Sequence, residues 1–156
     1  MPEKTNDKNT IRPVGENVIV PIKAEELVGK AIEMKKDGLR LSQAHCSWVN
    51  NQYEVSYSFA NDETLAYTTL RICVGRTAEL SSISEIYPYA AFYENEMEEL
   101  FGLKIRFKDL DYHNKLYRIK VKAPFLPEDQ RDVSTDTAQE KTGAADAPAG
   151  QKEDAN

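Results

Sequence analysis

Four glutamates close together are the strongest candidate for chemistry in this sequence. They are Glu94, Glu96, Glu98 and Glu99, in the run ENEMEE. Paired carboxylates can act as general acid and base in catalysis, or can bind a metal ion. Residues three or four apart share a face of a helix, whereas residues one or two apart do not. Helical spacing therefore allows two pairs, which are Glu94 with Glu98 and Glu96 with Glu99.

Glu96 also has apolar neighbours at helical spacing. Tyr93 precedes it by three residues and Leu100 follows it by four. A carboxylate on a partly apolar face needs a cation or a hydrogen-bond donor as its partner. The glutamate run can therefore be interpreted as a solvated acidic face, as a surface that contacts another protein, or as a catalytic pair.

The histidines and cysteines do not have the spacing of a metal site. They are His45, His113, Cys46 and Cys73, and no CxxC or HxxxH motif joins them. His45 and Cys46 are adjacent, so on a strand their side chains point to opposite faces. We expect two buried free thiols and no metal ion. We also expect no iron–sulfur cluster, because the usual clusters need four ligands.

Other common catalytic and binding motifs are missing as well. The sequence has no GxGxxG motif, no P-loop motif and no GxSxG nucleophile elbow. The net charge is −6 and no basic face is apparent, so we expect no nucleic-acid partner. No secretory signal and no apolar run of the roughly 20 residues that a membrane helix needs is apparent. We therefore expect a cytoplasmic protein that reaches a membrane only through a partner.

Two helices are predicted, and the second carries the glutamates. Residues 24–37 repeat apolar side chains every three or four positions and end before Gly38. Residues 88–101 begin at Pro88, which suits the first turn of a helix. They end before Gly102, which suits the position after the last turn.

Strand-like alternation of apolar and polar residues predicts a sheet. Three strands at short intervals are expected over residues 39–49, 52–59 and 64–74, joined at Asn50-Asn51 and Asn61-Asp62. Short turns require antiparallel neighbours, which makes these strands a meander. Residues 103–107 predict a fourth strand and 116–121 a fifth. The expected fold class is α+β: an antiparallel sheet, made of the meander plus one or two later strands, with two main helices on one face.

The charge is concentrated at the C-terminal end of the chain. Residues 128–156 contain eight acids and three bases, a net charge of −5, and almost no β-branched aliphatic residue. We expect a disordered acidic tail there, which acts as a solvated linker or steers a basic partner. Residues 1–14 are polar and are expected to be a flexible N-terminus. The folded domain is therefore expected at 15–127.

Residues 82–119, about a quarter of the chain, contain three groups that match a known pattern. The matching residues are Ser82, Ile83, Tyr87, Pro88, Ala91 and Phe92 or Tyr93; then Glu94, Glu96, Leu100, Phe101, Gly102 and Leu103; then His113, Leu116, Arg118 and Ile119. In this order they resemble the family of the 30-kDa subunit of respiratory complex I. The family also has shorter relatives in energy-converting, membrane-bound NiFe hydrogenases.

Departures from the family pattern favour the hydrogenase branch. Asn95 stands where the family usually has Arg, Glu98 at a usual aromatic and Glu99 at the usual Asp. Asn114 replaces a usual Pro and Lys120 a usual Leu. With its short folded core, the chain is most similar to the small cofactor-free subunit of Ech-type hydrogenases.

The resemblance implies a non-catalytic structural or assembly subunit. Such a subunit docks on the large catalytic subunit, beside a small iron–sulfur subunit, at the cytoplasmic face of the cell membrane. It holds no cofactor, and the partner subunits carry the NiFe and iron–sulfur clusters. The interface that the resemblance implies consists of Glu94, Glu96, Phe101, Gly102, His113 and Arg118. The two glutamates would meet partner cations, and His113 and Arg118 would donate hydrogen bonds.

Three other functions stay open on the sequence. The chain could be a free-standing α+β protein-interaction adaptor, the 30-kDa subunit of an NADH–quinone oxidoreductase proper, or a small enzyme that uses the glutamates. An enzyme predicts a concave site with a perturbed carboxylate. A docking subunit predicts a large exposed apolar patch on the isolated chain.

Overall fold

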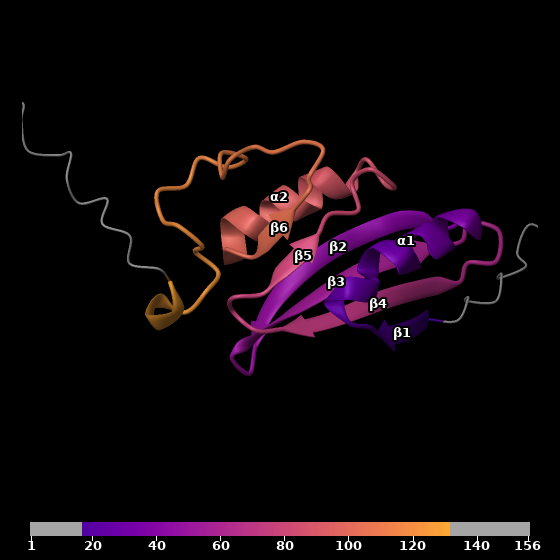
Figure 1. Ribbon diagram of the computed structural model, residues 1–156, viewed down its shortest axis with the longest axis horizontal. Helices are drawn as coiled ribbons and strands as arrows, with labels where there is room; N and C mark the ends of the chain where they lie inside the picture. The colour runs from indigo at the N-terminus through magenta and orange to yellow at the C-terminus, as the bar shows by residue number, and fades with distance from the viewer. Residues whose placement is uncertain (1–16, 132–156) are drawn as a thin grey trace, which may run out of the picture.

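The protein has the expected α+β fold, shown in Figure 1. The structure is a computed structural model, and it describes residues 17–131. Within this range, six strands in two sheets, two α-helices and two short 3-10 helices follow one another. Their bounds are β1 Asn17–Pro21, η1 Ala24–Glu26, α1 Leu27–Lys36, β2 Arg40–Val49, β3 Gln52–Ala60, β4 Tyr67–Val74, β5 Glu79–Ser81, α2 Ala90–Phe101, β6 Lys104–Arg106 and η2 Glu128–Gln130.

The predicted meander is the centre of the main sheet. Strands β2, β3 and β4 are antiparallel neighbours, in the sheet order β1-β4-β3-β2. The turn between β2 and β3 uses Asn50 and Asn51 at φ of 51° and 61°, a conformation that asparagine tolerates. The edge strand β1, which the sequence did not predict, pairs with β4 in parallel.

Both α-helices pack on the same face of this sheet. Alternate residues of β3 point to that face, and Tyr53, Val55 and Phe59 there are fully buried. They join Leu27 of α1 and Met97 of α2 in one apolar cluster. Each such side chain removed from water stabilises the fold by roughly 1.5–3 kcal/mol. This cluster places α2, with its glutamates, against the sheet.

The later strands differ from the prediction. Strand β6 exists, but it leaves the main sheet and pairs in parallel with β5 in a separate two-stranded sheet. The predicted strand at 116–121 is wrong, because those residues form bends. No strand edge pairs with them, and their first amides bond to a side chain of α2. Residues 107–127 instead run as an irregular segment across α2, drawn in orange in Figure 1.

Both helix C-termini follow the sequence prediction. Gly38 and Gly102 have φ of 76° and 67°, the left-handed conformation expected after the last turn. The expected N-terminus 1–14 and most of the expected tail, 132–156, lie outside the described residues. Residues 128–130 of the expected tail are described and form η2, and Arg131 follows them.

Candidate functional site

Glu94 points inward from α2 and is completely buried. One carboxylate oxygen, Oε1, accepts hydrogen bonds from the Ile83 amide at 2.9 Å and the Tyr57 hydroxyl at 3.3 Å. The other, Oε2, accepts one from the Ser82 hydroxyl. Burial raises the pKa of Glu94, and the hydrogen bonds from Ser82, Ile83 and Tyr57 oppose that rise. A group at this depth cannot meet a substrate or a partner cation, so the structure gives Glu94 intrachain partners in place of those we expected.

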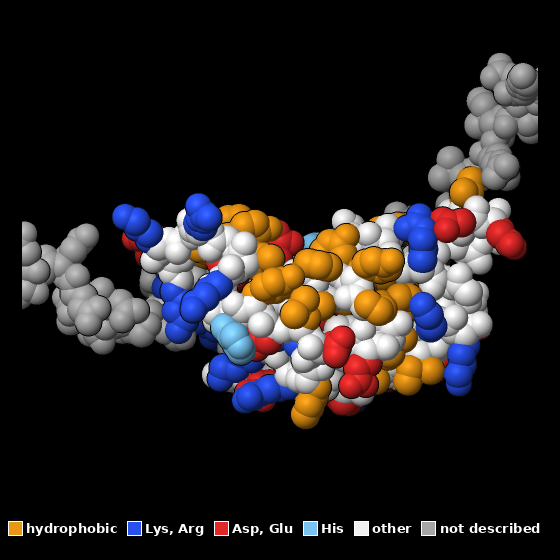
Figure 2. Space-filling model, turned by 90° about the horizontal axis from the view of Figure 1, so that it is seen from above, with side chains coloured by type: hydrophobic (Ala, Val, Ile, Leu, Met, Phe, Trp, Pro, Cys, Tyr) orange, Lys and Arg blue, Asp and Glu red, His pale blue; other side chains and the backbone are white. Residues whose placement is uncertain are grey.

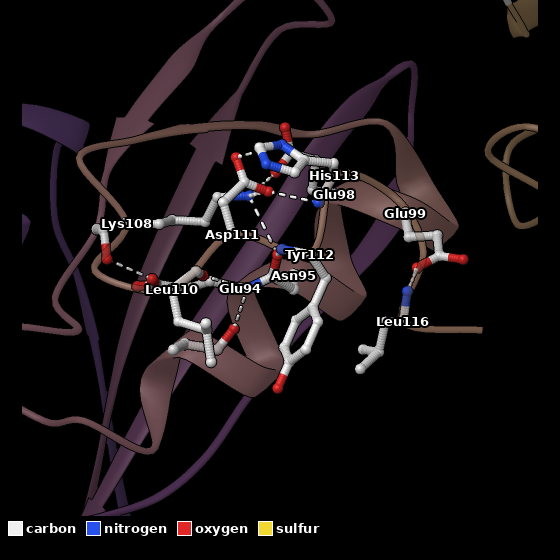
Figure 3. A network of polar contacts seen from close by, with 12 residues as sticks. Glu94, Asn95, Glu98, Glu99, Lys108, Leu110, Asp111, Tyr112, His113 and Leu116 are labelled. Atoms are coloured by element: carbon white, nitrogen blue, oxygen red, sulfur yellow. Dashed lines mark hydrogen bonds and ion pairs between the residues drawn. The ribbon is translucent and has the colours of Figure 1, made fainter.

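Asn95 fastens the irregular segment 107–127 to α2. Its side-chain NH2 donates to the Leu110 carbonyl at 2.8 Å, and its carbonyl oxygen accepts from the Tyr112 amide at 2.9 Å. The buried side chain of Asn95 thus pairs with one backbone donor and one backbone acceptor of the segment. Figure 3 shows this side chain pointing toward Leu110 and Tyr112. The sequence marked Asn95 only as a departure from a family pattern, with no signal for this role.

Glu99 holds the next part of the same segment. Its carboxylate accepts from the amide of Leu116 at 2.7 Å and from that of Tyr117 at 3.1 Å. Glu99 is 4% exposed, and the two backbone amides offset the free-energy cost of burying its carboxylate. Charge-assisted bonds of this kind are about twice as strong as neutral ones.

The two remaining glutamates of α2 complete the attachment. Glu98 forms an ion pair with Lys108. Glu96 accepts a hydrogen bond from the Tyr117 hydroxyl, and this bond is the main cause of the raised pKa of Tyr117. We call Asn95, Glu96, Glu98 and Glu99 the α2 clamp. Three of the four glutamates that suggested catalysis therefore hold a surface segment in place.

A turn at Asp111 presents His113 to solvent. The His113 amide donates to Asp111 Oδ1 at 2.7 Å, and this bond lowers the pKa of Asp111. His113 and the next residue both have positive φ, and the imidazole is 80% exposed. Arg118 is also exposed, and it makes no hydrogen bond or ion pair with the residues that the structure describes.

Phe101 and Gly102 lie at the other end of α2. The ring of Phe101 packs edge-on against Phe125 with centroids 5.4 Å apart. Gly102 has φ of 67°, the left-handed conformation that favours glycine, and a Cβ there would be in ordinary contact with the Cβ of Ala123 at 3.4 Å. The six residues of the expected interface therefore do not form one cluster. One is buried, three support the irregular segment from below, and two are exposed on it.

Exposed hydrophobic side chains are concentrated on the irregular segment, on α2 and on the residue before α2. Eight of the thirteen large hydrophobic side chains that are exposed in the described chain fall between residues 89 and 125. They are Tyr89, Phe92, Phe107, Leu110, Tyr117, Ile119, Val121 and Phe125, and we call them the apolar face. Figure 2, which looks down on this side of the molecule, shows hydrophobic side chains gathered across its middle.

Sequence reasoning missed most of the apolar face. A signal for part of it is present: residues 117–122, YRIKVK, alternate apolar and basic residues. The alternation was interpreted as a strand, although the same pattern serves an exposed segment that offers its apolar residues to a partner. Phe107 is the most exposed of the set at 82%, and its φ of 61° is unusual for a bulky residue.

The structure does not group ligands for a metal. Within residues 17–131, no three His, Cys, Asp or Glu side chains are arranged to hold an ion. Burial raises the pKa of the Cys46 thiol to about 12, whereas Cys73 is exposed, contrary to our expectation, because it points to the opposite face of the sheet. No helix in this range is long and apolar enough to cross a bilayer.

Comparison with known proteins gives a family and a similar fold. Residues 20–135 match the family described as the 30-kDa subunit of respiratory-chain NADH dehydrogenase. No curated protein matches the sequence. Among solved structures, the fold is similar to that of a chain in the membrane-bound sulfane sulfur reductase, an archaeal respiratory membrane complex, with a TM-score of 0.54 and 17% identity. The similarity covers 63% of this chain and 62% of that one.

Proposed function

This chain belongs to the family of the 30-kDa subunit of respiratory-chain NADH dehydrogenase, and we propose that it acts in a complex I-like oxidoreductase as a non-catalytic docking subunit. Its task is to bind the large catalytic subunit through the apolar face. The observation that carries this proposal is the exposure of eight large hydrophobic side chains over one helix and one irregular segment. Isolated soluble chains rarely expose so many together, and such surfaces usually bind another protein.

The construction of the apolar face supports docking over catalysis. The side chains that have catalytic potential, on α2, are occupied in holding residues 108–117. What they hold is a segment that exposes most of its large apolar side chains. Phe107 has the left-handed backbone conformation, which costs roughly 1–2 kcal/mol in a non-glycine residue.

The residues expected from the sequence have different parts in this interface. His113 and Arg118 are exposed and donate hydrogen bonds to the partner. Glu96 and Phe101 act indirectly, because they contact Tyr117 and Phe125 respectively. Gly102 acts indirectly as well, because its left-handed conformation ends α2 and turns the chain into β6.

For the complex itself, we favour an Ech-type, energy-converting membrane-bound hydrogenase. The departures at Asn95, Glu99 and Asn114 support this branch over NADH–quinone oxidoreductase proper. In such a complex the chain sits at the cytoplasmic face of the membrane, beside the large catalytic subunit and a small iron–sulfur subunit. The NiFe and iron–sulfur clusters belong to those partners, and the chain itself carries no cofactor.

Co-purification from native membranes in mild detergent tests the proposal. We expect the tagged chain to elute with a nickel- and iron-containing complex. The double variant Phe92→Ser, Phe107→Ser should lower affinity for the large subunit at least about 30-fold, since buried aromatic anchors dominate interfaces. Its matched control is Leu65→Ser, which removes an exposed apolar side chain from the β3–β4 loop.

Three results would overturn the proposal. Elution of the chain alone in every detergent would exclude a stable complex. Unchanged affinity of the double variant would exclude the apolar face as the interface. Elution with an unrelated protein and without metal would favour the free-standing adaptor.

A further inference from the structure

A basic groove lies beside the apolar face. Its volume is about 400 Å³, and it runs between the start of β6 and residues 119–122. Its cationic lining comes from Arg76, Lys104, Lys120 and Lys122. The two acids that also line it are already occupied, Glu98 by Lys108 and Glu99 by two backbone amides. The groove therefore has an excess of positive charge.

The three lysines of the groove form no ion pair in the described chain, although Lys104 lies opposite Glu79, a carboxylate that Arg106 already pairs. Lys104, Lys120 and Lys122 are exposed and form no ion pair with any residue from 17 to 131. The backbone next to them is equally open, because residues 118–122 make no hydrogen bond through their main chain within the same range. An extended acidic peptide could satisfy both the lysines and this backbone.

The chain itself carries an acidic segment that starts beside this groove. The carbonyl of Gln130 accepts a hydrogen bond at 3.4 Å from Nε of Arg76, a residue of the groove lining. The guanidinium of Arg131 donates to the carbonyls of Leu126 and Pro124, at 3.0 and 2.8 Å. These bonds hold the last described residues next to the groove. The 25 residues that follow contain six acids and two bases, a net charge of −4.

We propose that residues 132–156 of this chain occupy the basic groove when the protein is free, with their carboxylates against Lys104, Lys120 and Lys122. The short tether makes this binding intramolecular, with an effective concentration on the order of millimolar. Exposed ion pairs are individually weak and are screened by salt, so the contact is reversible. The segment shields the groove from other acidic molecules and leaves when the docking partner covers the neighbouring apolar face. This last step rests on the proposed function, whereas occupancy of the groove does not.

Amide NMR spectra of the full chain test the occupancy. The variant Asp132→Asn, Asp136→Asn, Glu140→Gln neutralises the first acids of the segment and keeps its length. A matched control, Asp37→Asn, Glu63→Gln, Glu85→Gln, changes the net charge equally at exposed sites elsewhere. We expect the first variant, but not the control, to shift the amide signals of Lys104 and residues 118–122. Raising NaCl from about 0.05 to 0.5 M should move the wild-type signals the same way, because screening lengths fall below about 5 Å.

Two spectral results would overturn the occupancy. One is unchanged groove signals in the first variant. The other is an equal shift in the control, which would assign the effect to net charge alone. If the partner moves the groove signals while the tail variant does not, the occupant is an acidic segment of the partner and the proposal is wrong.

A binding assay with the large subunit tests the competition. Neutralising the tail should tighten binding about fivefold to tenfold, since a few exposed ion pairs no longer oppose it. Weaker or unchanged binding would overturn the competition. If no binding occurs with either chain, the proposed function fails while the spectra still decide whether the tail fills the groove.

Discussion

The meander of β2, β3 and β4 and the irregular segment 107–127 satisfy their backbones in opposite ways. In the meander, backbone groups pair with backbone groups along two antiparallel ladders. In the irregular segment, backbone amides bond to side chains of α2, chiefly Asn95 and Glu99. A buried backbone group needs a partner in either case. The difference is that a ladder is a property of two strands, whereas the clamp depends on a few individual side chains.

The two regions also point their apolar residues in opposite directions. Alternate residues of β3 face the core, and Tyr53, Val55 and Phe59 are fully buried there. In the segment, Tyr117, Ile119 and Val121 alternate in the same way but are each more than 40% exposed. The same sequence pattern thus stabilises the fold in one region and provides a surface for association in the other.

The largest effect should come from truncating matched isoleucines in the two regions. Ile72→Ala creates a cavity in the core and should cost about 2–5 kcal/mol of unfolding free energy. Ile119→Ala, on the apolar face, should change the stability of the isolated chain by less than about 0.5 kcal/mol. Urea denaturation followed by circular dichroism measures both values. Equal losses of unfolding free energy in the two variants would show that the irregular segment belongs to the cooperative core, and would contradict the contrast between the two regions.

An intermediate effect is expected from weakening the clamp. Glu99→Gln leaves a single acceptor oxygen for the partly buried amides of Leu116 and Tyr117, and a lost hydrogen bond to a charged group costs about 1.5–3 kcal/mol. Hydrogen exchange should accelerate at these two amides roughly tenfold to hundredfold, since each 1.4 kcal/mol is a factor of about ten.

The control for the clamp is Glu85→Gln, an exposed glutamate with no hydrogen bond to the described residues. Amides of β3 should exchange at their normal rate in both variants. Acceleration throughout the domain in Glu99→Gln would mean that the clamp stabilises the whole fold and not the segment alone.

The smallest effect is on the pH dependence of the unfolding free energy. It comes from Glu94, which joins α2 to Tyr57 of β3 and to Ile83. Because burial raises its pKa in the folded state, the folded chain binds more protons than the unfolded chain just above pH 4.5. Glu94 therefore lowers stability as pH rises from its unfolded pKa through its raised folded pKa. In Glu94→Gln this decline should be absent. Denaturation curves from about pH 4.5 to 8 measure it, and parallel pH profiles for wild type and variant would contradict the raised pKa.

The meander could be predicted because its information is local. Residues 52–59 alternate cleanly, and the Asn50-Asn51 turn specifies an antiparallel return. Residues 116–121 alternate as well, so local pattern gave the same answer there. The prediction failed because a strand also needs a free neighbouring edge, and α2 holds the first amides of this segment through Glu99.

The candidate site could be located by sequence but not assembled from it. The sequence singles out the stretch around α2, and Gly102 has the backbone conformation expected of it. The roles of the glutamates were not accessible. Glu94 and Glu99 are the same residue type and lie five residues apart on α2, yet one faces the sheet and the other faces the irregular segment.

The sequence by itself determined the α+β class, the meander, both α-helices and their glycine ends, because each follows from local periodicity and backbone preference. Only the tertiary structure decided that β6 leaves the main sheet, that three of the four α2 glutamates belong to a clamp, and that most of the large apolar side chains of 107–127 face solvent. These features depend on contacts between residues that are far apart in the sequence. Such contacts determine which polar groups are hydrogen-bonded and which side chains are buried, and the local sequence pattern does not specify these contacts.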